Sequence, residues 1–202
     1  SRGYSPFPVK LPFDVPQILA AGSELKNTFC ITNKNYAFLS HHISDMENYE
    51  TLQSFQQGEE HFDRLSRVKP QAIACDMHPN YLATRYAIER AERENLPIFN
   101  IQHHHAHIAA CVAEHGFDGT RPVIGIAFDG TGYGEDGAIW GGEMLVADYQ
   151  SYQRVTHLEY FPLPGGDAAI KKPARTALAL LWSLGLEWDE RLAPVLEFCA
   201  DP

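Results

Sequence analysis

A cluster of histidines near the middle of the chain has the types and spacing to bind a metal. The run Gln102-His-His-His-Ala-His107 continues into the alanine-rich segment 108–114, which predicts a helix that starts near Gln102. Residues four apart lie on one face of a helix, so His103 and His107 would stand one above the other and clamp an ion. This spacing matches that of the two helical histidines in zinc enzymes, but the motif lacks the glutamate that serves as the general base there.

A carboxylate downstream could complete the ligand set. Asp129 follows the apolar segment 123–128, a predicted strand, and precedes the turn Gly130-Thr131-Gly132. Two imidazoles and this carboxylate would form a facial set of ligands, while the bare amides of the turn could face a phosphate. The turn matches neither the strict phosphate-loop pattern nor the dinucleotide fingerprint. A solvent-exposed polar helix start is the alternative for the histidines.

Length and composition are those of a globular protein. The chain has 202 residues, 45% of them hydrophobic and 21% charged, which is enough for one substantial core or two modest ones. A net charge of −10 argues against DNA as a partner. No stretch is apolar enough to span a membrane, and the first residues do not resemble a secretory signal. The four cysteines form no C-x-x-C pair, so we expect a cytoplasmic protein with reduced thiols and no membrane association.

The elements that must position these residues begin with a three-stranded meander and continue as alternating helices and strands. The predicted strands are 18–22, 28–32 and 36–40, then 72–76 and 98–102; the predicted helices are 50–68, 81–95 and the histidine helix. The order β-β-β-α-β-α-β-α is typical of a ribonuclease-H-like lobe, an α/β sheet with parallel crossovers.

After Gly116 the pattern restarts. A second meander is predicted over 123–128, 138–148 and 153–161, followed by a loop and an apolar helix over 174–186. Two copies of one order resemble the duplicated lobes of actin-like ATPases, in which nucleotide sits between the lobes. We therefore expect an α/β fold with a complete first lobe, a truncated second lobe and an extended linker before them. The predicted bounds are 1–17 for the linker, 18–118 for the first lobe and 119–202 for the second.

Seven short motifs follow one another along the chain. They are Ser1-Arg-Gly-Tyr4, Ala21-Gly-Ser-Glu-Leu-Lys-Asn-Thr-Phe-Cys30, Cys75-Asp-Met-His-Pro79, Gln102-His-His-His-Ala-His107, Phe128-Asp-Gly-Thr-Gly-Tyr-Gly134, Trp140-Gly-Gly-Glu143 and Pro164-Gly-Gly-Asp167. With these motifs the chain resembles the carbamoyltransferase domain of the HypF family of hydrogenase maturation proteins. That domain is similar to the TsaD family, which makes threonylcarbamoyl-adenosine on transfer RNA. The second and sixth motifs favour HypF over TsaD.

The resemblance implies a reaction sequence. In HypF-like proteins carbamoyl phosphate and ATP give a carbamoyl-adenylate in a separate YrdC-like domain, and the domain seen here passes the carbamoyl group to the C-terminal cysteine of HypE. The thiocarboxamide later becomes a cyanide ligand of [NiFe]-hydrogenase. The resemblance also implies that residues 1–17 connect to a preceding YrdC-like domain and that one more aspartate ligand lies beyond Pro202. This fragment alone is then expected to be inactive.

The resemblance also assigns residues to the site. His103, His107 and Asp129 match the metal ligands of the family, and the metal would be divalent, either Fe(II) or Zn, acting as a Lewis acid. His104 and His105 point to other helix faces and are expected not to ligate.

Backbone groups and one polar turn would bind the rest of the substrate. Asp129, Gly130, Thr131 and Gly132 are expected to approach ATP or the carbamoyl-adenylate. Lys26 and Asn27 are expected to hydrogen-bond the carbamoyl oxygen or a phosphate in the catalytic step, with a solvated turn as the alternative.

Two other functions remain open from the sequence. One is a threonylcarbamoyl transferase that acts on transfer RNA, which the acidic charge balance and the HypF-like motifs disfavour. The other is a non-catalytic fragment that binds a structural metal and a protein partner. A structural metal would be needed for folding, whereas a catalytic one would leave the fold standing when it is removed.

Overall fold

The computed structural model describes residues 8–200 and shows a mixed α/β fold. The chain forms two compact units, the first ending at His157 and the second starting at Leu158, and each is described here by itself. None of the described helices is long and apolar enough to cross a membrane.

A five-stranded sheet forms the first part of the first unit. Its order is β1-β3-β2-β4-β5, and the strands are β1 (Val9–Val15), β2 (Ile18–Ala20), β3 (Cys30–Leu39), β4 (Ala72–Asp76) and β5 (Ile98–Ile101). Strands β2, β4 and β5 run parallel, so their carboxyl ends meet at one edge of the sheet. That edge carries Asp76, the last residue of β4, and leads directly into the histidine helix.

Strand β3 turns back on itself. The backbone N–H of Ser40 donates to the carbonyl of Phe29 at 2.8 Å, so the two ends of β3 lie side by side. A straight strand of this length would hold its ends roughly 30 Å apart. The reversal falls near Lys34, whose φ of 55° lies in the left-handed region. The meander and the turn at 33–35 predicted from the sequence therefore agree with the structure.

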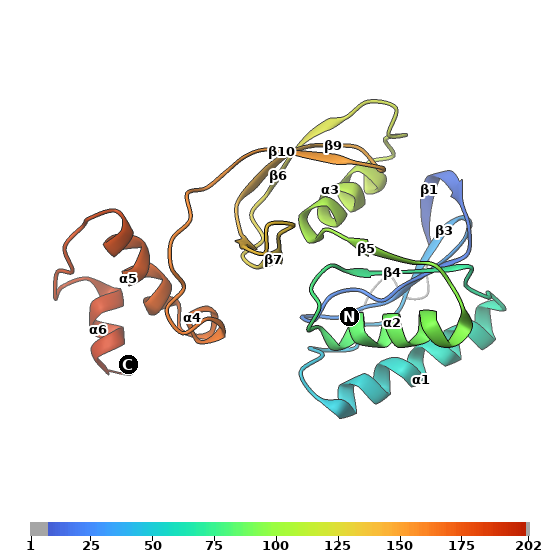
Figure 1. The fold of residues 1–202 in the computed structure, drawn as a ribbon, viewed down its shortest axis with the longest axis horizontal. Coiled ribbons are helices and arrows are strands. Elements are labelled where there is room, and N and C mark those ends of the chain that lie inside the picture. Colours follow the sequence, from blue (N-terminus) through green and yellow to red (C-terminus); the bar gives the residue numbers. More distant parts are fainter. Residues whose placement is uncertain (1–7, 201–202) are drawn as a thin grey trace. The chain divides into compact units, whose positions relative to one another are not determined.

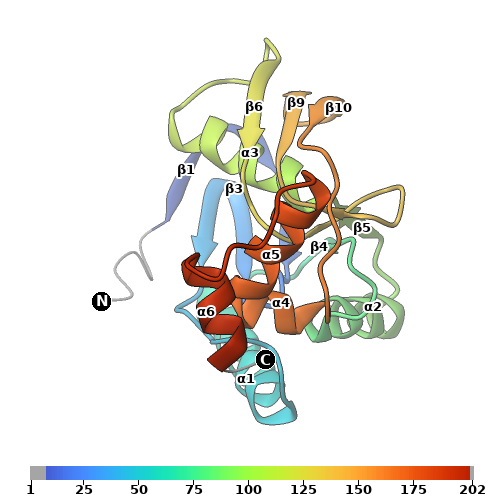
Figure 2. The same cartoon turned by 90° about the vertical axis from the view of Figure 1, so that its left-hand side faces the viewer.

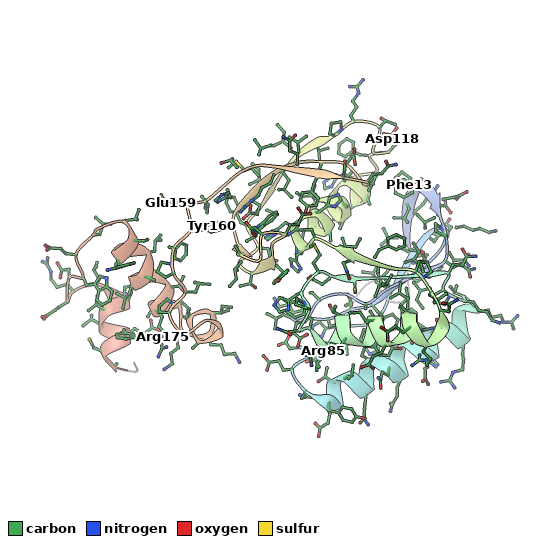
Figure 3. The ribbon with its side chains drawn as sticks, viewed as in Figure 1. Phe13, Arg85, Asp118, Glu159, Tyr160 and Arg175 are labelled. Atoms are coloured by element: carbon green, nitrogen blue, oxygen red, sulfur yellow. The ribbon has the colours of Figure 1, made fainter. Side chains whose placement is uncertain are left out.

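The linker prediction is wrong for residues 9–15. These residues form β1, which pairs antiparallel with β3 through Val9↔Ala37 and Lys10↔Tyr36, while residues 1–7 of the predicted linker lie outside the described part of the chain. Proline is compatible with this strand, because Pro12 lies on an edge strand, where a missing N–H breaks no ladder. Phe13 then packs edge-on against Tyr149 with ring centroids 4.7 Å apart (Figure 3).

Two helices cover one face of this sheet, α1 (Tyr49–Ser66) and α2 (Leu82–Glu94) (Figure 1). Phe55 of α1 and Tyr86 of α2 are buried with Leu19, Ile31 and Ile73 of the strands in one core. Asn48 caps α1 by accepting a hydrogen bond from Thr51 N, as expected for an amide at a helix start. The residues of this first core thus all precede the histidine helix in the sequence.

A buried ion-pair network joins the two helices. Arg90 of α2 contacts Glu59 and lies 2.8 Å from Asp63, both on α1, and its side chain is only 6% exposed. Tyr86 donates its hydroxyl to the other oxygen of Glu59 at 2.8 Å. Charges buried at this depth are tolerated because each one has a partner.

The histidine helix α3 (His103–Glu114) packs against a second sheet, of order β10-β9-β6 (Figure 2). The strands are β6 (Val123–Ala127), β9 (Glu143–Ala147) and β10 (Tyr152–His157), beside a small ribbon of β7 (Gly132–Tyr133) and β8 (Ile139–Trp140). Ile108 and Val112 of α3 lie in one core with Leu145 of β9. The helix therefore bridges the two sheets, with its first residues at the edge of one and its apolar face on the other.

The second unit contains three helices, α4 (Asp167–Lys171), α5 (Pro173–Ser183) and α6 (Ala193–Ala200). The apolar helix predicted over 174–186 corresponds to α5. Within the unit, the indole N–H of Trp188 donates to the carbonyl of Leu178 at 3.2 Å. Residues 119–157 fold with the first unit, and the predicted lobe boundary at 118/119 stays a prediction.

Candidate metal centre

The first turn of α3 presents two imidazoles to the same point. Gln102 caps the helix by accepting a hydrogen bond from His105 N at 2.8 Å, which fixes where the helix begins. The Nε2 atoms of His103 and His107 then lie 3.2 Å apart. The predicted i, i+4 pair is therefore present on one helix face.

Asp129 brings a carboxylate to this pair from the end of β6. Its Oδ2 lies 2.6 Å from Nε2 of His103 and 3.5 Å from Nε2 of His107. Two ligand atoms at about 2.1 Å from one tetrahedral ion are about 3.4 Å apart. The separations of 3.2 and 3.5 Å are close to this value, whereas the 2.6 Å contact is a hydrogen bond that would lengthen when a divalent metal binds. Within the described part of the chain, these residues are the one group of three or more potential ligands whose atoms lie close enough, all within 4.8 Å of one another.

The cluster is open to an incoming ion. The side chains of His107 and Asp129 are 59% and 42% exposed, whereas that of His103 is 15% exposed. Two cavities adjoin it. One of about 330 Å³ is lined by Gly22, Ser23 and His103, and one of about 600 Å³ is lined by Asp129, with His107 shared by both. A small ligand could thus reach the metal position from the protein surface.

His103 lies between two carboxylates. Its Nδ1 is 2.7 Å from Oδ2 of Asp76, and its Nε2 faces Asp129. The hydrogen bond with Asp76 is the main reason that the pKa of His103 is raised, with a smaller contribution from Asp129, while burial opposes the shift. In the charged form of the ring, a metal would have to displace the proton on Nε2. The sequence alone does not reveal this contact, because a position at a strand end does not identify the partner of Asp76.

His104 and His105 do not join the cluster, as predicted. His104 is fully buried, and its Nε2 donates to the backbone carbonyl of Asp129 at 3.0 Å. His105 donates through Nε2 to the carbonyl of Asp148 at 2.7 Å. These two imidazoles fasten α3 to the loops that follow β6 and β9.

The two glycines after Asp129 have different surroundings. A Cβ at Gly132 would come within 2.3 Å of the His104 ring, so this glycine is required by packing. A Cβ at Gly130 would meet no described atom within 4 Å. Gly130, with Thr131 beside it, is therefore the part of the loop with room for a phosphate, and the predicted contact with nucleotide stays a prediction there.

Asn27 is buried in the loop that follows β2. Asn27 is 1% exposed, and its amide donates to the carbonyls of Ala21 and Ser23 at 3.0 and 2.5 Å. It thus holds the loop that contributes Gly22 and Ser23 to the smaller cavity, and its role in the catalytic step stays a prediction. Lys26 is exposed. Within residues 8–200, its side chain makes no contact with the cluster, so its catalytic role stays a prediction.

Family models match most of the chain. Residues 14–114 match the HypF Kae1-like domain, and residues 125–199 match the second subdomain of the carbamoyltransferase Kae1-like domain. All three residues of the cluster lie within these ranges, two in the first and one in the second.

Individual relatives agree with the family models. The chain is 44% identical to carbamoyltransferase HypF2 of Cupriavidus necator over 92% of its length and 45% identical to carbamoyltransferase HypF of Synechocystis over 90%. It superposes on a crystal structure of full-length HypF in the phosphate- and nucleotide-bound form with a TM-score of 0.82 and 49% identity, and on T. kodakarensis HypF with 0.83 and 39%. These matches cover about 90% of this chain but only 23–24% of each relative, so the chain spans about a quarter of their length.

Proposed function

Because this chain belongs to the HypF family of carbamoyltransferases, we propose that it carries the metal-binding part of the site that passes a carbamoyl group from carbamoyl-adenylate to the C-terminal cysteine of HypE. The observation that supports this most directly is the convergence of His103, His107 and Asp129. Carbamoyl phosphate and ATP would supply the adenylate elsewhere in the whole enzyme.

The residues of the cluster have the donor chemistry for Fe(II) or Zn, with two imidazole nitrogens and one carboxylate. A divalent metal bound there would supply Lewis-acid stabilisation for phosphate or carbamoyl oxygens. Around it, Gly130 leaves space for an anion, and His104 fixes the backbone of Asp129. The similar structure of full-length HypF in the phosphate- and nucleotide-bound form supports ATP or carbamoyl-adenylate as the small-molecule ligand.

The finer fold interpretation belongs to the same proposal. The sheet order β1-β3-β2-β4-β5 and the second meander β10-β9-β6 support two ribonuclease-H-like lobes of an actin-like ATPase. The cluster combines two residues of α3, which belongs to the first proposed lobe, with one residue that follows β6, the first strand of the second proposed lobe. The metal would thus lie where the two proposed lobes meet. A cytoplasmic setting, without DNA or membrane partners, is also part of the proposal.

The test uses the full-length enzyme that contains this chain. Wild type, His103→Ala and the control His61→Ala, which alters an exposed imidazole on α1, are incubated with carbamoyl phosphate, ATP and HypE. We expect mass spectrometry to detect carbamoylated HypE with wild type and His61→Ala but not with His103→Ala. Metal content measured on the same samples should fall only in His103→Ala.

Three results would decide against this proposal. Transfer to transfer RNA but not to HypE would favour the threonylcarbamoyl alternative. Loss of the folded state on chelation would favour a structural metal. Full activity of His103→Ala would show that the cluster is not required for carbamoyl transfer.

A further inference from the structure

Asp76 ends strand β4 beside the candidate metal centre without joining it. Its Oδ2 lies 2.7 Å from Nδ1 of His103, on the side of the ring opposite to Asp129. Among residues 8–200, the group of ligands that could share an ion contains His103, His107 and Asp129 but not Asp76. The carboxylate therefore contacts a ligand and not the position of the ion.

The Asp76 side chain is held in this orientation by its own loop. Its Oδ1 accepts a hydrogen bond from the backbone N–H of His78 at 2.8 Å, and its carbonyl accepts one from Thr84 Oγ1 at 3.2 Å. The side chain is 5% exposed. With one oxygen used by the loop and the other directed at His103, the carboxylate cannot turn away without losing a buried hydrogen bond.

We propose that Asp76 is a positioning residue that sets the tautomer of His103 for metal binding. A neutral imidazole carries one proton, and a carboxylate at Nδ1 retains it there as a donor. Asp129 also faces the ring, at 2.6 Å from Nε2, but its side chain is 42% exposed whereas that of Asp76 is 5% exposed, so the contact shielded from water holds the proton at Nδ1 and leaves the lone pair on Nε2. Outer carboxylates of this kind orient metal-bound histidines and raise their basicity. This inference rests on the proposed metal site.

The variant Asp76→Asn separates this role from simple packing. Its amide oxygen would keep the acceptor that His78 N–H requires, which leaves the NH₂ group facing Nδ1 of His103. Nδ1 would then have to accept, and the ring proton would move to Nε2, where the metal binds. The shape of the residue is unchanged, so a purely structural role predicts little effect on the tautomer.

The matched control is Asp118→Asn. Asp118 also accepts a hydrogen bond from the backbone N–H two residues later, that of Thr120, at 2.9 Å. It lies in the loop before β6 (Figure 3), and within residues 8–200 its side-chain hydrogen bonds go to Thr120 and not to an imidazole. Asp118 thus makes the same backbone hydrogen bond as Asp76 but has no contact with a histidine ring.

The experiment measures Zn²⁺ affinity by competition with a chromophoric chelator and the His103 tautomer by ¹⁵N NMR of the metal-free protein at a pH where the ring is neutral. We expect wild type and Asp118→Asn to bind equally, with the proton on Nδ1. Asp76→Asn should bind 10- to 100-fold more weakly, with the proton on Nε2. Unchanged affinity in Asp76→Asn would overturn the inference.

The outcome remains decisive if Asp76→Asn fails to fold. The tautomer of wild-type His103 needs no variant, and a proton on Nε2 in the metal-free protein would overturn the inference by itself. His103→Ala distinguishes the two proposals. If His103→Ala binds Zn²⁺ as tightly as wild type, the proposed metal site is wrong. If His103→Ala loses Zn²⁺ binding but Asp76→Asn binds as wild type does, the metal site is supported and the positioning role of Asp76 is wrong.

Discussion

The Nε2 atom of His104 lies 3.0 Å from the backbone carbonyl of Asp129, so a histidine that cannot reach the candidate metal holds the residue that can. The contact joins the first turn of α3 to the loop after β6. Gln102 supports it from behind, because its Nε2 lies 3.2 Å from Nδ1 of the same ring. The position of the carboxylate ligand therefore depends on a buried imidazole 25 residues earlier in the chain.

His104→Phe should loosen this loop. The phenyl ring keeps most of the volume but leaves the Asp129 carbonyl without its donor, which should lower the free energy of unfolding by about 1–3 kcal/mol. Urea denaturation would measure this cost. The exposed control His61→Phe should change stability by no more than about 0.5 kcal/mol, and an equal loss in both would show that the Asp129 contact is unimportant.

Gly132→Ala and Gly130→Ala should differ although only one residue separates them. A Cβ at Gly132 would collide with the His104 ring, whereas at Gly130 it would enter open space. Gly132→Ala should cost about 1–3 kcal/mol through overpacking, and Gly130→Ala should cost less than about 1 kcal/mol. Thermal unfolding of both variants checks the order, and a more harmful Gly130→Ala would contradict it.

Removing metal should leave the fold intact. The cores on either side of α3 are formed by apolar side chains that do not involve the three ligands, so the chelated protein should retain its far-UV circular dichroism spectrum. Zinc at 100 times its Kd should add about 2.7 kcal/mol to the free energy of unfolding. His107→Ala should lose this increment and His61→Ala should keep it; collapse of the spectrum on chelation would refute the expectation.

Arg90→Ala should be strongly destabilising. It would leave Glu59 buried next to Asp63 without the guanidinium that neutralises it, at a cost of about 3–5 kcal/mol. The matched change Arg93→Ala removes an arginine whose side chain is 63% exposed and should cost no more than about 1 kcal/mol. Equal denaturation midpoints for the two variants would show that the network contributes little.

The metal-free protein should lose some stability as the pH rises above 6.5. The pKa of His103 is raised above its ordinary value of 6.5, so the folded state binds this proton more tightly than the unfolded chain. The contribution is complete below pH 6.5 and disappears as the pH passes the folded pKa. Urea midpoints of wild type and Asp76→Asn with a chelator would test this, because the variant lacks the main cause of the shift and should show the weaker pH dependence.

Local patterns in the sequence predicted the alternation of strands and helices between residues 18 and 114 and the helical histidine pair. Periodicity marks helices and strands, and a four-residue spacing places His103 and His107 on one face wherever the helix lies. The glycine turn after an apolar strand likewise placed Asp129 at a strand end. The edge strand β1 was missed because Pro12, together with Pro6 and Pro8 before the strand, obscured the alternating apolar residues of 9–15, and only its partner β3 identifies it as part of the sheet.

The tertiary structure alone decided which side chains meet. Asp76 and His103 are 27 residues apart, and nothing local shows that the ends of β4 and β5 are neighbours until the parallel sheet forms. Asn27 has the chemistry to bind substrate, but the fold buries it and directs its amide to its own loop. The residue types and their spacing thus defined what chemistry was available, while long-range packing determined which groups face the site, because burial and hydrogen-bond partners depend on segments far apart in the chain.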